Sequence, residues 1–276
     1  MTGVQEGFVE VSDHRIAYSR GGDRASIALI HGIPTSRYLW RNVAAVLDRA
    51  GLGWIAVDLL GYGDSSKPSG IDLGIATQAR MVERALAKLG WTHGTIVGHD
   101  IGGGVAQLLA ANRPDLVRRL VLVDTIAYDS FPEPGIARLK EPVWDAILGA
   151  EDFDLKKGLA KGLQRGMIQK QNVSREMVAE YERPFKGVAG RNAYLRAARA
   201  LRSEDLVSRV QEVESLDIPT LIVWGAHDEF QPLSYGQRLA HAMRNARLEV
   251  FDDAGHFLPE DAPDALGRLI AEFTKT

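Results

Sequence analysis

Short apolar runs alternate with longer amphipathic segments along most of this sequence, and that alternation constrains the fold more than any other feature. The runs have the length and composition of strands that are buried on both faces, and the segments between them have helical periodicity. Strands separated by helices in this way indicate a mostly parallel sheet covered by helices on both faces. The expected strands are SIALI (26–30), GWIAVD (53–58), HGTIVG (93–98), LVRRLVLVD (116–124), PTLIVWG (219–225) and ARLEVFD (246–252).

The first segments and the helices complete this α/β pattern. FVEVSD and RIAYSR alternate apolar and polar residues, which is typical of an antiparallel hairpin at the edge of a sheet. Helices are expected near residues 40–50, 77–90, 101–113, 233–244 and 262–274.

The alternation stops between about residues 127 and 214. This region is rich in charged residues, has helical periodicity and contains no convincing strand. We therefore predict that residues 127–214 form a helical cap domain over the sheet, and that residues 1–126 and 215–276 form the core domain. A chain of 276 residues, of which 45% are hydrophobic, is long enough to bury such a core.

Asp100 lies at the turn between an expected strand and an expected helix. The stretch GHDIG (98–102) has the form of a nucleophile elbow, in which glycines allow a tight turn and close packing of helix on strand. Taken alone, Asp100 has another explanation as the N-cap of the helix. His99 is expected to support the turn from behind and not to react.

Two other residues follow the ends of later strands. Asp228 comes after the strand that ends near residue 225, and His256 comes after the strand that ends near residue 252. Together with Asp100 they have the order nucleophile, acid, histidine, which is one chain order of a catalytic triad. Each also has an ordinary explanation, Asp228 as a turn residue and His256 as a capping or core histidine.

The stretch LIHGIPTS (29–36) supplies a second turn at a strand end. The backbone N–H of Ile33 is a candidate partner for the N–H of Ile101 in an oxyanion hole. An ordinary Gly-Pro turn is the alternative. His31, which precedes this turn, is expected to contact the substrate.

These motifs together resemble the α/β-hydrolase family from end to end. With Asp100 as the nucleophile, the sequence is similar to the branch that contains haloalkane dehalogenases, fluoroacetate dehalogenases and epoxide hydrolases. The resemblance implies Asp228 as the triad acid, with Asp124 as the alternative because some dehalogenases place the acid there. The motifs that carry the likeness are HGIPTSRYLWRNV, DLLGYGDSSKP, VGHDIGG, YERPF and GHFLPEDAPD.

An aspartate nucleophile suits attack on an sp3 carbon. Serine would form an ether there, whereas Asp100 forms an ester that can be hydrolysed. The carboxylate is ionised at neutral pH, so His256 is free to activate water in a second step while Asp228 orients the imidazole. An ester or amide substrate would give an anhydride, which disfavours ordinary esterase or peptidase activity.

The choice between halide and epoxide substrates depends on the donors to the leaving group. Haloalkane dehalogenases typically have tryptophan after the nucleophile, with asparagine after the His-Gly or a second tryptophan in the cap. Here Ile101 and Ile33 occupy the first two positions, and Trp144 is the candidate in the cap. Fluoroacetate dehalogenases typically have arginine where this chain has Ile101.

Epoxide hydrolases hold the epoxide oxygen with one or two tyrosines of the cap, whose hydroxyls donate hydrogen bonds. Tyr194 is the first candidate, and Tyr181 and Tyr128 are possible second donors. Amphipathic packing of the cap is the alternative role for each. We therefore predict hydrolysis of an epoxide to a diol. Dehalogenation of a haloalkane or haloacid is the alternative, followed by a small-molecule receptor and by a lyase that spares Asp100.

Composition narrows the partners and cofactors. A net charge of −3 without a block of like charges predicts a small-molecule substrate, and neither nucleic acid nor a membrane as partner. The sequence has no cysteine, and its seven histidines lack the spacing of metal ligands, so no metal or cofactor is expected. Without a signal segment or an apolar run of about 20 residues, we expect a cytoplasmic monomer or homodimer.

Overall fold

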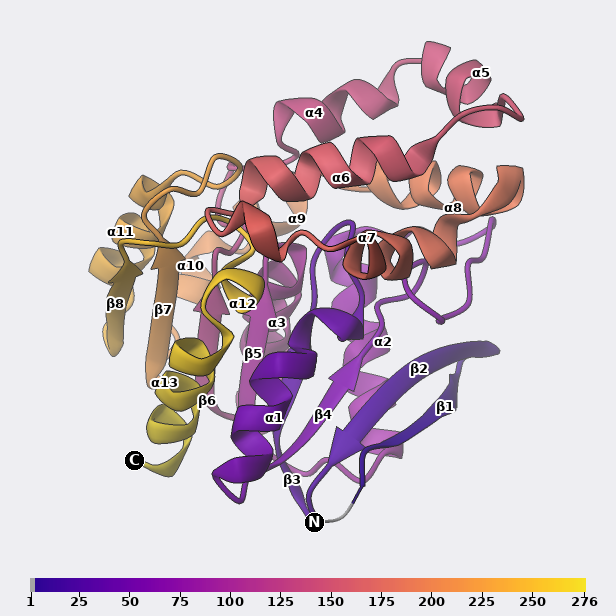
Figure 1. The fold of residues 1–276 in the computed structure, drawn as a ribbon. Helices are drawn as coiled ribbons and strands as arrows, with labels where there is room; N and C mark the ends of the chain where they lie inside the picture. The colour runs from indigo at the N-terminus through magenta and orange to yellow at the C-terminus, as the bar shows by residue number, and fades with distance from the viewer. Residues whose placement is uncertain (1–2) are drawn as a thin grey trace.

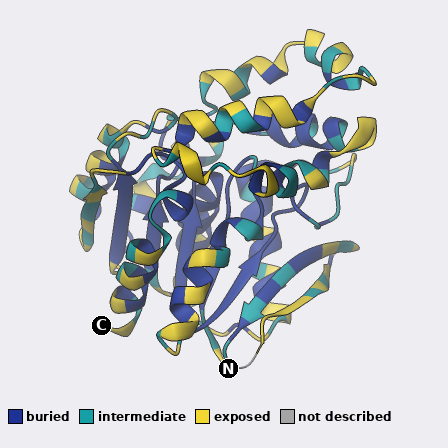
Figure 2. Cartoon of the chain, in the orientation of Figure 1, coloured by how far each residue is buried: buried dark blue, intermediate teal, exposed yellow. Residues whose placement is uncertain are grey.

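An eight-stranded sheet forms the centre of the molecule in a computed structural model that describes residues 3–276. Its strand order is β1-β2-β4-β3-β5-β6-β7-β8, and the middle strands are buried on both faces (Figures 1 and 2). The strands are β1 (Gln5–Val11), β2 (His14–Gly21), β3 (Ala25–Ile30), β4 (Gly53–Val57), β5 (Gly94–His99), β6 (Val117–Val123), β7 (Thr220–Gly225) and β8 (Ala246–Phe251).

The sheet is mostly parallel, as the sequence predicts. The strands β1 and β2 form an antiparallel hairpin at one edge, and β2 also pairs antiparallel with β4. All the remaining neighbours pair in parallel. The carboxyl ends of the six parallel strands therefore lie along one edge of the sheet, where ligands of such sheets bind.

Helices cover both faces of the sheet. One apolar cluster contains the buried side chains of α1 and α13, and a second contains those of α2, α3 and α11 on the opposite face. These are the helices that the periodicity predicts. Their bounds are α1 (Arg41–Arg49), α2 (Ile75–Lys88), α3 (Ile101–Asn112), α11 (Leu233–Ala242) and α13 (Pro263–Lys275), with the single-turn α12 (Leu258–Asp261) before the last.

A helical insertion between β6 and β7 lies across one end of the sheet (Figure 1). In the described chain it contains no strand, as expected, whereas its status as a separate cap domain stays a prediction. Its helices are α4 (Pro134–Ala137), α5 (Val143–Gly149), α6 (Leu155–Gly166), α7 (Arg175–Glu182), α8 (Gly187–Arg199), α9 (Glu204–Val207) and α10 (Val210–Glu214). Short 3-10 turns are η1 (Arg37–Trp40), η2 (Arg138–Lys140), η3 (Lys170–Asn172) and η4 (Arg183–Phe185).

Ion pairs hold the insertion against the sheet domain. Arg165 at the end of α6 pairs with Glu229 in the loop after β7, and Arg202 pairs with Asp72. Exposed pairs of this kind contribute little stability, but they fix the direction of the helices that they join. Among residues 3–276, no helix has the length and the hydropathy needed to cross a membrane.

Candidate active site

Asp100 occupies a strained turn between β5 and α3. Its φ of 51° and ψ of −121° lie outside the regions that aspartate ordinarily adopts. Any side chain at Gly98 or Gly102 would collide with backbone oxygen atoms, which explains why both positions are glycine. The Asp100 side chain makes no capping hydrogen bond to α3, so the explanation of this residue as a simple N-cap fails.

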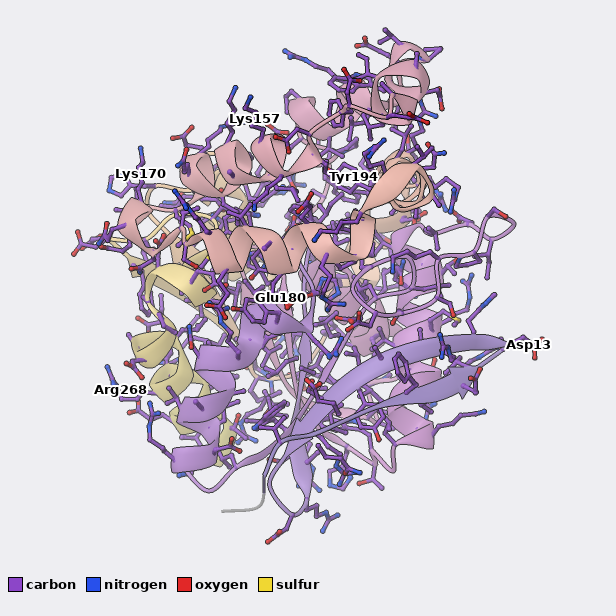
Figure 3. All side chains as sticks on the ribbon, turned by 45° about the vertical axis from the view of Figure 1, so that its right-hand side comes forward. Asp13, Lys157, Lys170, Glu180, Tyr194 and Arg268 are labelled. Carbon is purple, nitrogen blue, oxygen red and sulfur yellow. The ribbon has the colours of Figure 1, made fainter. Side chains whose placement is uncertain are left out.

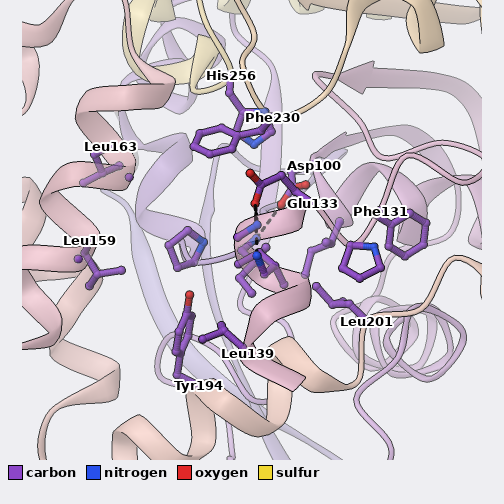
Figure 4. Close-up of a pocket in the computed structure, with 18 of the residues that line it drawn as sticks. Asp100, Phe131, Glu133, Leu139, Leu159, Leu163, Tyr194, Leu201, Phe230 and His256 are labelled. Carbon is purple, nitrogen blue, oxygen red and sulfur yellow. Dashed lines mark hydrogen bonds between the residues drawn. The ribbon is translucent and has the colours of Figure 1, made fainter. Parts of the chain in front are cut away.

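Two backbone N–H groups face the Asp100 carboxylate. Ile33 N donates to Asp100 Oδ2 over 2.9 Å (Figure 4), and the backbone N–H of Ile101, the next residue, also favours the ionised form of this carboxyl. Burial raises the pKa of Asp100 to about 6, although His256 and these two N–H groups act to lower it. The structure thus brings the two expected oxyanion donors to the expected nucleophile.

His256 pairs with Asp228. Its Nδ1 lies 2.9 Å from Asp228 Oδ2, while Asp228 Oδ1 accepts from the backbone N–H groups of Phe230 and Gln231 at 2.7 and 2.8 Å. Burial acts to lower the pKa of His256, but the charges of Asp228 and Asp100 outweigh it, so this pKa lies above its ordinary value. The arrangement orients the imidazole with Nε2 as the nitrogen free for proton transfer.

Asp124, the alternative acid, is engaged elsewhere. Its Oδ1 accepts from Gly225 N at 2.7 Å, and its buried Oδ2 has no partner among the described residues. Burial, reinforced by the charge of Asp228, raises the pKa of Asp124 well above its ordinary value. Asp228, and not Asp124, is therefore the acid that contacts His256.

A cavity of about 300 Å³ opens above the Asp100 carboxylate (Figure 4). Five polar or charged side chains reach it, those of Asp100, Glu133, Tyr194, Gln231 and His256. The remaining wall is apolar and comes from strand ends of the sheet and from helices of the insertion. It includes Ile33, Ile101, Ile126, Phe131, Leu139, Trp144, Leu148, Phe153, Leu155, Leu159, Leu163, Leu201, Phe230 and Phe257.

Tyr194 and Trp144 line this cavity, as expected for substrate contacts. The Tyr194 hydroxyl points into the cavity, and none of residues 3–276 engages it in a hydrogen bond (Figure 4). Burial, with a further effect of Glu133, raises the pKa of Tyr194 to about 12. The phenol therefore stays protonated and can donate to a bound ligand.

Three residues that were expected to contact the substrate, Tyr181, Tyr128 and His31, lie outside the cavity. Tyr181 donates its hydroxyl to Glu260 Oε1 at 2.6 Å, and Tyr128 donates to Glu214 Oε1 at 2.9 Å. Tyr181 thus joins α7 to α12, and Tyr128 joins the segment after β6 to α10.

His31 is fully buried behind the oxyanion turn. Its Nδ1 lies 2.8 Å from Gly32 O, and its Nε2 accepts from Leu59 N at 3.0 Å. Burial lowers the pKa of His31, which keeps the ring neutral and suits this pair of bonds. It holds the turn in place and does not touch the cavity.

Glu133 and Gln231 are cavity residues that the sequence analysis does not identify. Glu133 caps α4 with its carboxylate and pairs with Arg165 at 3.0 Å, while the buried Gln231 Oε1 has no partner among the described residues. Their positions just after β6 and β7, at the carboxyl edge of the sheet, are the only signal in the sequence. In the described part of the chain, no three His, Cys, Asp or Glu side chains converge to hold a metal ion. The expectation of a site without cofactor stays a prediction.

Comparison with known proteins finds chains of similar sequence and fold. The family model described as alpha/beta hydrolase fold matches residues 26–263. The chain is 32% identical over 276 residues to a soluble epoxide hydrolase of Corynebacterium sp. (strain C12), covering 92% of this chain and 91% of the relative. It is 31% identical over 275 residues to haloalkane dehalogenase 2 of Mycobacterium tuberculosis (strain H37Rv), covering 96% and 93%.

A solved structure agrees in fold along nearly the whole chain. It is the crystal structure of an alpha/beta hydrolase fold protein from Burkholderia ambifaria, with a TM-score of 0.88 and 26% identity. The match covers 96% of this chain and 97% of that one.

Proposed function

This chain belongs to the alpha/beta hydrolase fold family and is a hydrolase, and on that premise we propose that it hydrolyses epoxides to diols through an ester on Asp100. The observation that carries the proposal is Tyr194, a protonated phenol that points into the cavity shared with Asp100 and is not bonded to protein. An opening epoxide needs a donor of this kind for its oxygen.

The first step forms the ester. Because Oδ2 of Asp100 is held by Ile33 N–H, we assign Oδ1 as the attacking oxygen. Its bond to an epoxide carbon forms as the C–O bond of the ring breaks, and the released oxygen takes the proton of the Tyr194 hydroxyl. The resulting phenolate is reprotonated from solvent.

The second step hydrolyses the ester. His256 Nε2 accepts a proton from water, and the hydroxide attacks the carbonyl carbon of Asp100. The N–H groups of Ile33 and Ile101 stabilise the oxyanion that develops on Oδ2. The bond between the Asp100 carbonyl carbon and Oδ1 then breaks, and the departing diol oxygen takes the proton from His256. The new carboxylic acid of Asp100 releases its proton to solvent, which restores the carboxylate and balances the proton taken up by Tyr194.

Dehalogenation of a haloalkane is the second candidate, and Trp144 is the observation that favours it. This tryptophan lines the cavity, and an indole N–H is a suitable donor to a halide. Against it, Ile33 and Ile101 stand where haloalkane dehalogenases carry amide or indole side chains. Neither lysine nor arginine lines the cavity, which also disfavours a haloacid.

Epibromohydrin distinguishes the two reactions, because it carries an epoxide and a carbon-bromine bond in one small molecule. We expect 3-bromopropane-1,2-diol without release of bromide. Release of bromide with formation of glycidol would instead identify a dehalogenase. Asp100→Asn is the control that lacks the proposed nucleophile. If the parent protein and Asp100→Asn bind epoxides equally well and neither turns them over, the protein is a receptor.

A further inference from the structure

The cavity is built for an uncharged ligand. Neither lysine nor arginine lines it, and apart from Asp100 and His256 its only charged side chain is Glu133. That carboxylate is largely buried, with 13% of its side chain exposed, and it is held by Arg165 and by two N–H groups at the start of α4. A ligand carboxylate would lose its hydration beside a second carboxylate, which is costly without a cation.

The cavity opens between α4 and α6. Of the residues that line it, only Gly135 on α4 and Gly158 on α6 are exposed, and Gly162, one turn further along α6, is half-buried. Both helices belong to the insertion above the sheet, and α4 lies above α6 in the view of Figure 1. The most exposed residues of the cavity lining are therefore glycines, which carry no side chain.

Gly158 and Gly162 have no packing reason to be glycine. A Cβ atom built at either position meets no atom within 4 Å, whereas one at Gly166 would lie 2.7 Å from the rings of Phe230 and Phe257. Glycine within a helix costs about 1 kcal/mol relative to alanine. Four residues apart, the two glycines lie on one face of α6, next to the buried Leu159 that also lines the cavity.

We infer that the substrate is an uncharged epoxide with an extended apolar substituent, which leaves the catalytic centre between α4 and α6 and lies over Gly158 and Gly162. This inference rests on the proposed epoxide hydrolysis. The absent side chains leave room for the substituent along α6, and the leucines of that helix supply its apolar contact.

A series of terminal epoxides tests the inference, with 1,2-epoxybutane, 1,2-epoxyoctane and 1,2-epoxydodecane as substrates. In the unmodified protein we expect kcat/KM to rise with chain length, by about fourfold for each methylene group that becomes buried. Gly162→Leu should lower kcat/KM for the two longer epoxides by about tenfold or more and change that for epoxybutane by less than about twofold. An equal loss on all three substrates, or no dependence on length in the unmodified protein, overturns the inference.

Lys157→Leu is the matched control, because it adds the same side chain to the outer side of the same helix (Figure 3). It should leave kcat/KM for all three epoxides unchanged.

Gly162→Ala guards against a folding defect, since alanine favours the helix and should raise the melting temperature. The charge requirement is tested with 7,8-epoxyoctanoate, which should react at least about tenfold more slowly than 1,2-epoxyoctane. Equal rates would overturn the assignment of an uncharged substrate.

Binding separates failure of this inference from failure of the proposed reaction. The change in tryptophan emission on titration with 1-butanol and 1-octanol reports occupancy, because Trp144 lines the cavity and a bound alkanol alters its surroundings. If no epoxide is turned over but 1-octanol binds more tightly than 1-butanol and loses this preference in Gly162→Leu, the reaction is wrong and the apolar channel stands. If epoxides are turned over and Gly162→Leu retains the length dependence, the channel is wrong and the reaction stands.

Discussion

The His99 imidazole donates from Nε2 to the backbone oxygen of His256 over 2.8 Å, and so connects the residue before Asp100 to the residue proposed to activate water. The two rings lie 4.9 Å apart. Burial, with a further effect of His256, lowers the pKa of His99 well below its ordinary value, so the ring is neutral and Nε2–H is its donor. His99 is thus a positioning residue for His256.

His99→Ala should therefore slow hydrolysis of the ester more than its formation. A displaced His256 no longer aligns water with the ester, and we expect kcat to fall by about tenfold or more with a smaller change in the rate of the first step. Rapid-quench measurement of the ester checks this, with His99→Gln as the conservative variant because its amide can donate to the same oxygen. Equal slowing of both steps would argue for a general packing defect.

His256→Gln should trap the ester on Asp100. The first step needs only the ionised carboxylate and the Tyr194 donor, whereas the second needs the imidazole as a base. Intact-protein mass spectrometry should show an added mass equal to that of the epoxide, and digestion should place it on the peptide that contains Asp100. Asp100→Asn provides the control, and turnover by His256→Gln at the parental rate would contradict the role of His256.

The raised pKa of Asp100 predicts the acid side of the pH profile. Because only the ionised carboxylate attacks, kcat/KM should fall by about tenfold per pH unit below the pKa of about 6. Ester formation also removes the Asp100 charge that helps to raise the pKa of His256. The pKa of His256 should therefore be lower in the ester than in the free protein. Hydrolysis of the accumulated ester should continue at pH values at which His256 of the free protein is already protonated. A pH profile that stays level down to pH 4 would exclude the proposed titration of Asp100.

Tyr194→Phe should selectively impair opening of the epoxide. Loss of the proton donor should reduce the rate of ester formation by about 100-fold or more, while packing is preserved because the ring remains. Tyr181→Phe is the matched control: that hydroxyl bonds to Glu260 outside the cavity, so its loss should affect stability and not the rate of opening. If both variants open epoxides at the parental rate, another group supplies the proton.

Asp124→Asn and Asp228→Asn should differ sharply in activity. The amide oxygen in Asp124→Asn can still accept from Gly225 N, and it is Asp228 that contacts His256, so activity should stay within a few-fold of the parent, as measured by initial rates. Asp228→Asn removes the charge that orients His256 and should reduce kcat by about a thousandfold or more. Similar losses in both variants would mean that the two carboxyls share the role.

Stability supplies a second measurement for the same pair. The folded pKa of Asp124 is raised above its unfolded value, so its favourable contribution is complete below the unfolded pKa and is lost as the pH rises toward the folded pKa. Asp124→Asn should remove this pH-dependent loss of stability, so its free energy of unfolding at pH 8 should exceed that of the parent. Denaturant unfolding at pH 4 and pH 8 measures the difference.

Much of the fold follows from local sequence patterns. The six parallel strands and the five long helices of the sheet domain all form within a few residues of their expected positions. Apolar periodicity is a property of near neighbours, and the glycines around Asp100 leave few conformations for the chain at that turn. The strand ends then bring Asp100, Asp228 and His256 to one edge of the sheet.

The positions of the insertion's side chains depend on contacts between distant segments. Tyr181 and Tyr194 are both tyrosines on amphipathic helices, and sequence alone does not distinguish their roles. In the structure, Glu260 and Arg41 pair with each other, and Glu260 also binds the Tyr181 hydroxyl, whereas Tyr194 faces the cavity.

The sheet, the order of the candidate triad and the chemistry open to an aspartate nucleophile can be read from the sequence, because they depend on local periodicity and residue type. The contact of His256 with Asp228 and not with Asp124, and the orientation of Tyr194 and Glu133 toward the cavity, emerge from the folded chain alone. The physical reason is that burial and long-range hydrogen bonds set both the direction and the charge of each of these side chains, and neither exists until the distant segments have packed together.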